Sequence, residues 1–188
     1  MKSRVAVAGR ARLFLAIPLP SRIQTILQET LKHYTPYVER VTPQQNWHIT
    51  LIFLGDVDNY QQLTGGLAQP LTQTFLPTIS LTHVGVGCVP TQLWAYANPS
   101  PVLANLHAAV ADRVHSLNLT IPEHTRKKGF VPHIKLARLS NKSGIGIADY
   151  PLAKTFVAKD IHVYRSELSS AGAQYTVEGT ISLSAVEQ

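Results

Sequence analysis

The chain has 188 residues and is poor in cysteine and in apolar runs. Cys88 is the only cysteine, so no disulfide can form within the chain, and we expect a reducing, cytoplasmic location. No apolar run approaches the roughly 20 residues that a membrane-spanning helix needs. The basic N-terminal segment is interrupted by Gly9, Arg10 and Arg12, which is untypical of a secretion signal. We therefore expect a protein that neither crosses nor binds a membrane.

Acidic residues are also scarce, with 11 Asp and Glu against 17 Lys and Arg and a formal charge of +6. This excess suits a polyanionic partner, because each phosphate that is neutralised releases counterions and adds affinity. A basic surface without such a partner has the same composition, so charge alone does not decide between the two. Hydrophobic residues make up 45%, which is typical of a globular protein of one domain or of two small lobes that share a core.

Two segments far apart in the sequence repeat one pattern, in which a histidine opens an apolar run. The first is His48-Ile-Thr-Leu and the second is His133-Ile-Lys-Leu. Successive side chains of a strand face opposite sides, so His48 and Thr50 share one face, and His133 and Lys135 share the matching face of a second strand. Each strand thus offers a histidine and a hydrogen-bond donor to one side and apolar residues to a core. We expect the two polar faces to meet across one cleft.

Further elements are predicted around these two strands. Ser21 with Gln24 forms a capping-box pattern for one helix, Asp58 is a candidate N-cap for a second, and Ser100-Pro101 predicts a third. Runs of β-favouring residues predict strands over residues 12–18, 37–41, 78–89, 93–97, 156–166 and 174–184. Strand–helix units mixed with adjacent strands favour an α+β protein with mostly antiparallel sheets and helices on the outside.

A pair of histidines can serve several kinds of chemistry. A metal site would need a third ligand, and neither segment carries Asp, Glu or Cys. No Gly-x-Ser-x-Gly nucleophile pattern and no glycine-rich phosphate loop with its lysine is present. Paired general acid–base catalysis remains, in which each proton transfer contributes about 10²–10⁴ in rate. With Thr50, Lys135 and Arg138 as nearby donors, a phosphodiester is the substrate whose developing charge this site would stabilise.

The two histidine segments resemble the twin His-x-Thr-x motifs of the 2H phosphoesterase superfamily. Two further segments, and the second histidine segment extended at both ends, are similar to its RNA 2′,3′-cyclic phosphodiesterase (LigT-like or 2′-5′ RNA ligase-like) branch: Arg12-Leu-Phe-Leu-Ala-Ile-Pro-Leu-Pro, Ser166-Glu-Leu…Gly172-Ala-Gln-Tyr, and Pro132-His-Ile-Lys-Leu-Ala-Arg. The likeness runs from Arg12 to about Leu183. It implies one bilobal, pseudo-twofold α+β domain over residues 1–188, with sheets that line a central cleft, helices outside and a flexible N-terminus of about ten residues.

The resemblance also implies an activity, the hydrolysis of 2′,3′-cyclic phosphate ends of RNA to 2′-phosphates without metal or cofactor. It implies that His48 donates a proton to the departing 3′ oxygen and that His133 activates water as the base. Thr50 and Arg138 would bind the phosphate. Lys135 departs from the motif, which has threonine there. We expect this lysine to replace the hydroxyl donor with a charged one and to lower the pKa of His133, with activity retained.

Phe130 and Trp94 are candidates for stacking on a terminal base. Four basic residues are candidates for guiding an RNA strand to the cleft: Arg126, Lys127, Lys128 and Arg165. Two alternatives to hydrolysis stay open, namely the reverse joining of tRNA halves through a 2′-5′ linkage and noncatalytic binding of RNA ends. We expect the protein to be a monomer whose partner is RNA, or a nucleotide, with a 2′,3′-cyclic phosphate.

Overall fold

The structure is a computed structural model that describes residues 9–73, 76–123, 129–140, 146–169 and 172–185. The flexible start that the sequence predicts falls largely on residues 1–8, which lie outside the described residues. Arg126, Lys127 and Lys128 also lie outside them. None of the helices in the described part of the chain is long and apolar enough to span a membrane.

The first of the two sheets in the described part of the chain has the strand order β3-β1-β9-β10-β4. Its neighbours pair antiparallel, except that β4 runs parallel to β10. The strands are β1 (Arg10–Pro18), β3 (His48–Asp58), β4 (Leu71–Gln73), β9 (Asp160–Ser169) and β10 (Gly172–Ala185). His48 is therefore the first residue of an edge strand.

The second sheet has the order β2-β7-β6-β5-β8, and all its neighbours pair antiparallel. Its strands are β2 (Val38–Val41), β5 (Thr78–Val86), β6 (Gln92–Ala97), β7 (His133–Leu139) and β8 (Tyr150–Val157). The antiparallel runs β3-β1-β9-β10 and β7-β6-β5-β8 each begin with the strand that opens with a motif histidine. The two lobes thus have matching strand orders, and β3 and β7 contact each other.

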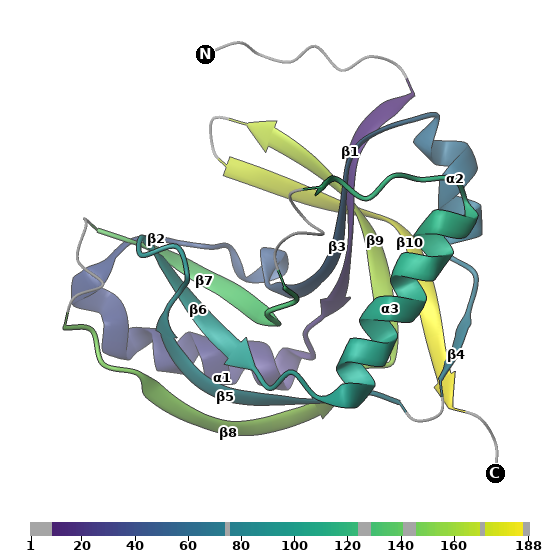
Figure 1. Cartoon of the computed structure of the whole chain (residues 1–188). Coiled ribbons are helices and arrows are strands. Elements are labelled where there is room, and N and C mark those ends of the chain that lie inside the picture. Colours follow the sequence, from purple (N-terminus) through teal and green to yellow (C-terminus); the bar gives the residue numbers. More distant parts are fainter. Residues whose placement is uncertain (1–8, 74–75, 124–128, 141–145, 170–171, 186–188) are drawn as a thin grey trace.

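The helices lie outside the sheets (Figure 1). Helix α1 (Ser21–Leu31) contacts β8, α2 (Tyr60–Leu67) contacts β10, and α3 (Pro101–Ser116) contacts both β3 and β5. Two short 3-10 helices, η1 (Lys32–Tyr37) and η2 (Gln44–Asn46), flank β2. Because α3 contacts a strand of each sheet, it joins the two lobes. One continuous hydrophobic core runs through both.

The strand predictions are largely confirmed, with two strands missed. Strands were expected near β1, β2, β5, β6, β9 and β10, and all are present. One missed strand is the three-residue β4. The other is β8, whose exposed residues alternate irregularly with the buried Leu152 and Phe156. Its pairing with β5 forms it, and this long-range contact has no local signature in the sequence.

Helix α1 begins at Ser21 as predicted, but two of the three N-caps differ from the sequence prediction. Ser100 caps α3 as expected, accepting a hydrogen bond from the Leu103 N–H. At α1 the N-cap is Pro20, and the Gln24 side chain donates instead to the Leu19 carbonyl. At α2 the N-cap is Asn59, in a left-handed conformation with φ 53°, because Asp58 remains paired within β3.

Candidate active site

His48 is held at the start of β3 by two hydrogen bonds. Its Nδ1 lies 2.8 Å from the carbonyl oxygen of Asn46, and its Nε2 lies 3.0 Å from the Thr50 hydroxyl. A carbonyl only accepts hydrogen bonds, so we assign the hydrogen of the neutral ring to Nδ1, which leaves Nε2 to accept from Thr50. Burial lowers the pKa of His48 to about 4, with a smaller contribution from the charge of His133 and an opposing one from Asn46.

His133 has the same arrangement at the start of β7. Its Nδ1 lies 2.8 Å from the Val131 carbonyl, again two residues back along the chain. The ring stacks on Trp94, with centroids 3.6 Å apart and planes at 18°. Its pKa is lowered, mainly by burial and further by the charge of Lys135. Nε2 of His133 has no hydrogen-bond partner among the described residues, so it is available to a substrate.

The two histidines influence each other electrostatically, as the effect of His133 on the pKa of His48 shows. Each keeps its Nδ1 on a carbonyl of the segment before its strand, and their strands are in contact. The polar faces predicted from the sequence therefore lie near each other at the junction of the two sheets.

An aromatic cluster that sequence reasoning did not single out surrounds His48. The ring of His48 lies 4.9 Å from Phe14 on β1, 5.7 Å from Tyr164 on β9 and 5.5 Å from Tyr175 on β10. These rings exclude water, which favours the neutral imidazole and accounts for its low pKa. Phe14 and Tyr175 both fall in segments that resemble the family, and this was the available signal.

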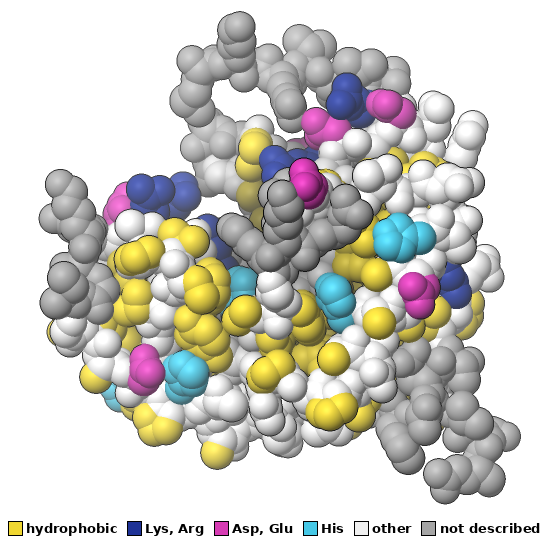
Figure 2. Space-filling view, viewed as in Figure 1, with side chains coloured by type: hydrophobic (Ala, Val, Ile, Leu, Met, Phe, Trp, Pro, Cys, Tyr) yellow, Lys and Arg dark blue, Asp and Glu magenta, His cyan; other side chains and the backbone are white. Residues whose placement is uncertain are grey.

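Three basic side chains gather beside His133. Lys135 and Arg138 lie opposite Trp94 and Gln92 of β6, and a register shift between them brings both onto the same face of β7. Arg40 of β2 lies opposite Arg138. Burial lowers the pKa of Lys135, and the charges of these two arginines lower it further. Figure 2 shows dark blue Lys and Arg side chains gathered beside the hollowed part of this face.

The sequence did not single out Arg40, because only the β2–β7 pairing places it beside the motif lysine. Arg138 is partly neutralised, since its Nε donates to Glu39 at 3.1 Å. Arg165 is engaged more fully, with ion pairs to Glu178 and Glu167. Lys135, Arg40 and Arg138 thus lie together beside His133, whereas Arg165 is paired within the first sheet.

The two aromatic candidates are less open than a stacking site requires. Trp94 is only 7% exposed, because His133 covers one face and Gly87 packs against its fused ring. It supports His133 and leaves no open face for a base. Phe130 stacks on His107 of α3, with centroids 4.5 Å apart, and its remaining surface lines a hollow beside Pro132.

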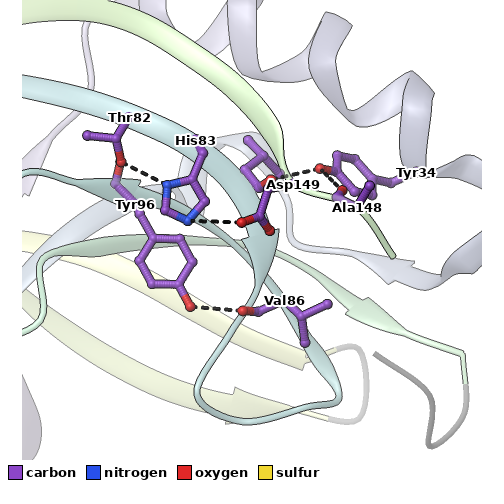
Figure 3. A network of polar contacts seen from close by, with 8 residues as sticks. Tyr34, Thr82, His83, Val86, Tyr96, Ala148 and Asp149 are labelled. Carbon is purple, nitrogen blue, oxygen red and sulfur yellow. Dashed lines mark hydrogen bonds and ion pairs between the residues drawn. The ribbon is translucent and has the colours of Figure 1, made fainter. Parts of the chain in front are cut away.

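A column of rings continues from His133 into the second sheet. Trp94 lies 5.7 Å from Tyr96, which stacks on His83 at 4.5 Å and 13°. Figure 3 shows how polar contacts anchor this column: Thr82 and Asp149 flank the His83 ring, and the Tyr96 hydroxyl donates to the Val86 carbonyl at 2.8 Å. The column thus extends from His133 across β6 to β5.

The described residues contain no group of three or more His, Cys, Asp or Glu side chains that could hold a metal ion. The groups that the described residues bring near the two imidazoles include the Thr50 hydroxyl and the cations of Lys135, Arg40 and Arg138. Such a set can move protons and stabilise an anionic phosphorus group.

Comparisons with known proteins agree with this architecture. A profile of the 2′-5′ RNA ligase superfamily matches residues 17–167. The chain is 26% identical over 175 residues to an RNA 2′,3′-cyclic phosphodiesterase of Escherichia coli (strain K12), covering 88% of this chain and 92% of that protein. It is 25% identical over 139 residues to a protein of the same name from Archaeoglobus fulgidus, covering 70% and 74%.

Solved structures show the same fold. The apo crystal structure of E. coli LigT superposes with a TM-score of 0.75 at 24% identity, covering 94% of this chain and 99% of that one. The crystal structure of TT0787 of Thermus thermophilus also gives a TM-score of 0.75, at 25% identity, covering 94% and 100%. The bilobal α+β architecture is thus that of LigT, and the chain belongs to the 2′-5′ RNA ligase superfamily.

Proposed function

We propose that this protein is an RNA 2′,3′-cyclic phosphodiesterase that hydrolyses the cyclic phosphate end to a 2′-phosphate. The observation that carries the proposal is the twin arrangement of His48 and His133, each with Nδ1 held 2.8 Å from a carbonyl and both near the junction of the two lobes. Two relatives that match most of the chain are named for this activity, which supports the same reading.

In this proposal the two imidazoles have complementary roles. Neutral His133 accepts a proton from water through Nε2 while the water oxygen bonds to phosphorus. The bond from phosphorus to O3′ breaks, and protonated His48 donates its Nε2 proton to O3′. The phosphate stays on O2′, and proton exchange with solvent returns both histidines to their starting states. A fixed Nδ1 contact on each ring aims Nε2 at the reacting group, and such orientation lowers the barrier.

The remaining polar groups of the cleft would bind the phosphate. The Thr50 hydroxyl lies beside the donor nitrogen of His48, and Lys135 shares a β7 face with His133. Arg138 and Arg40 extend this cationic surface along β7 and β2. Charge-assisted hydrogen bonds from these groups would stabilise the negative charge that grows in the transition state, so the proposed reaction needs no metal ion.

Product analysis tests the proposal. An oligonucleotide with a 2′,3′-cyclic phosphate end is incubated in excess EDTA, and the position of the product phosphate is determined. We expect a 2′-phosphate from the wild type, and a loss of at least about 10²-fold in rate in His48→Ala and in His133→Ala. His33→Ala is the matched control. His33 stacks on Tyr150 of β8, at the opposite end of the β7-β6-β5-β8 run from the strand that carries His133. A 3′-phosphate product would refute the assigned roles.

Two other outcomes point to the alternatives. Reverse joining is a candidate because the same two imidazoles can exchange roles, and it would appear as a 2′-5′ linked product from tRNA halves. Binding of a cyclic-ended oligonucleotide with no turnover by the wild type would instead indicate a protein that only recognises RNA ends.

A further inference from the structure

A hollow of about 320 Å³ lies beside the segment that leads into β7. Three parts of the chain line it: Thr82 and His83 of β5, Tyr96 of β6 with the residues that follow it, and residues 130–132. We call it the second-lobe hollow. Its volume falls within the range of about 300–1,000 Å³ that is typical of small-molecule sites, and the proposed acid–base chemistry leaves it unused.

The second-lobe hollow adjoins His133. Tyr96 is the register partner of His133 across β6 and β7, and paired residues present their side chains to one face of a sheet. Val131, whose carbonyl holds the His133 ring, is two residues from His133, which is at most about 7 Å along the chain. A group bound in the hollow would therefore lie next to the imidazole that we assign as the base.

Rings make up much of the lining. Tyr96 stacks on His83 with centroids 4.5 Å apart and planes at 13°, and Figure 3 shows the two rings side by side. Phe130 stacks on His107, and its remaining surface lines the hollow beside Pro132. Walls of this kind suit a flat ligand, because such a ligand can contact them over most of its area.

The charges around the hollow indicate a neutral ligand. None of the described residues that line it is Lys or Arg, and the carboxylate of Asp149 lies 3.8 Å from Nε2 of His83. A phosphate would find no fixed cation there and would be repelled by Asp149. The exposed Asn98 also lines the hollow, and its side chain has no hydrogen bond to any described residue. Its amide can both donate and accept, which suits the polar edge of a base.

The cations of the site lie in the other direction. Lys135 and Arg138 follow His133 along β7, whereas the residues that line the hollow precede it in the chain. His133 thus separates a cationic surface from a neutral, ring-lined one. In the proposed substrate the cyclic phosphate marks the 3′ end, so every further nucleotide lies on the 5′ side of the terminal one. Apart from the terminal base, the flat neutral group nearest to the reacting phosphate is then the base of the preceding nucleotide.

We propose that the second-lobe hollow binds the base of the nucleotide that precedes the terminal one, held between Phe130 and the Tyr96 ring with Asn98 at its polar edge. This inference rests on the proposed function and specifies its substrate as an RNA strand of at least two nucleotides. Bases of single-stranded RNA can turn out of their stack and insert between aromatic side chains, so the proposal requires an unpaired end.

The test uses three substrates that share the terminal nucleotide. They are adenosine 2′,3′-cyclic phosphate, the dinucleotide ApA with a 2′,3′-cyclic phosphate, and the same dinucleotide without the base of its first nucleotide. The two dinucleotides carry the same linking phosphate, so their difference in kcat/KM measures the first base alone. Contact of a base with aromatic side chains contributes about 5- to 150-fold in affinity, and we expect the wild type to prefer the complete dinucleotide by at least about 5-fold.

Two variants remove parts of the hollow. His83→Ala takes away one ring, and Asn98→Ala takes away an exposed amide whose loss leaves folding intact. Each should lose at least about half of the preference for the complete dinucleotide, mainly through a higher KM, and should turn over adenosine 2′,3′-cyclic phosphate at the wild-type rate. His115→Ala is the matched control and should keep the preference, because His115 is an exposed histidine of α3 that does not line the hollow.

The outcomes separate the two proposals. Equal kcat/KM for the two dinucleotides in the wild type overturns the base site and leaves the proposed function intact. A preference that both variants keep in full also overturns it, because the base would then bind elsewhere. An equal loss on all three substrates has the same meaning, since the variants would then act through His133. If the wild type hydrolyses none of the three, the proposed function fails and the base site fails with it.

Discussion

An anion bound between the histidines should raise the pKa of His48 by at least two units. Without a ligand, burial among Phe14, Tyr164 and Tyr175 lowers this pKa to about 4. At pH 7 only about one molecule in a thousand would then carry the proton that the proposed donor needs. The substrate itself must therefore supply the missing stabilisation of the imidazolium.

The magnitude follows from Coulomb's law. A unit negative charge about 4 Å from the imidazolium, at an effective dielectric constant near 20, stabilises it by about 4 kcal/mol. At 1.36 kcal/mol per unit, this raises the pKa by about three units, from about 4 to about 7. His48 would then be about half protonated at neutral pH in the complex, although it is almost wholly neutral in the free protein.

The assay is an NMR titration of the histidine ring carbons with and without sulfate, whose charge is constant over the range used. His48→Gln identifies the resonance, and sodium chloride at equal ionic strength is the control. Kinetics gives a second readout, because kcat/KM reports the free protein and kcat the complex. The optimum of kcat/KM should lie at lower pH than that of kcat. A free pKa near 6.5, or a pKa that sulfate leaves unchanged, would refute the reasoning.

Three further predictions concern single residues. The folded-state pKa of His48 lies below its unfolded value of about 6.5, so the free energy of unfolding should fall by up to about 3 kcal/mol as the pH is lowered from 6.5 to 4. Urea denaturation at these pH values measures the fall, which should be smaller in His48→Gln. Lys135→Thr removes a charge that lowers the pKa of His133, so the acidic limb of kcat/KM should move to higher pH; an unmoved limb would contradict this role. Trp94→Ala should lose about 3–5 kcal/mol of stability and should have a lower kcat. Trp94→Phe keeps a ring under His133 and should retain most of the stability and most of kcat. Equal kcat in the two variants would exclude a supporting role for Trp94.

Local signals predicted some helix boundaries and missed others. Ser100-Pro101 was read correctly because the serine hydroxyl and the proline ring act on the first turn of α3 itself. Ser21 and Gln24 carry the same kind of signal, and α1 does begin at Ser21, but its N-cap is Pro20 and Gln24 donates to the Leu19 carbonyl, so the capping box does not form.

The sequence by itself determined the pairing of a histidine with a polar neighbour on each of two strands, because the two-residue period of a strand assigns faces locally. It also determined the family, through four short segments in order. Only the tertiary structure decided what surrounds those histidines. Pairing between strands that are distant in the sequence places Arg40 near Lys135 and Tyr164 near His48, and Trp94 stacks on His133. Contacts between distant strands depend on register and bulges, and these are set by packing of the whole core, which no short segment records.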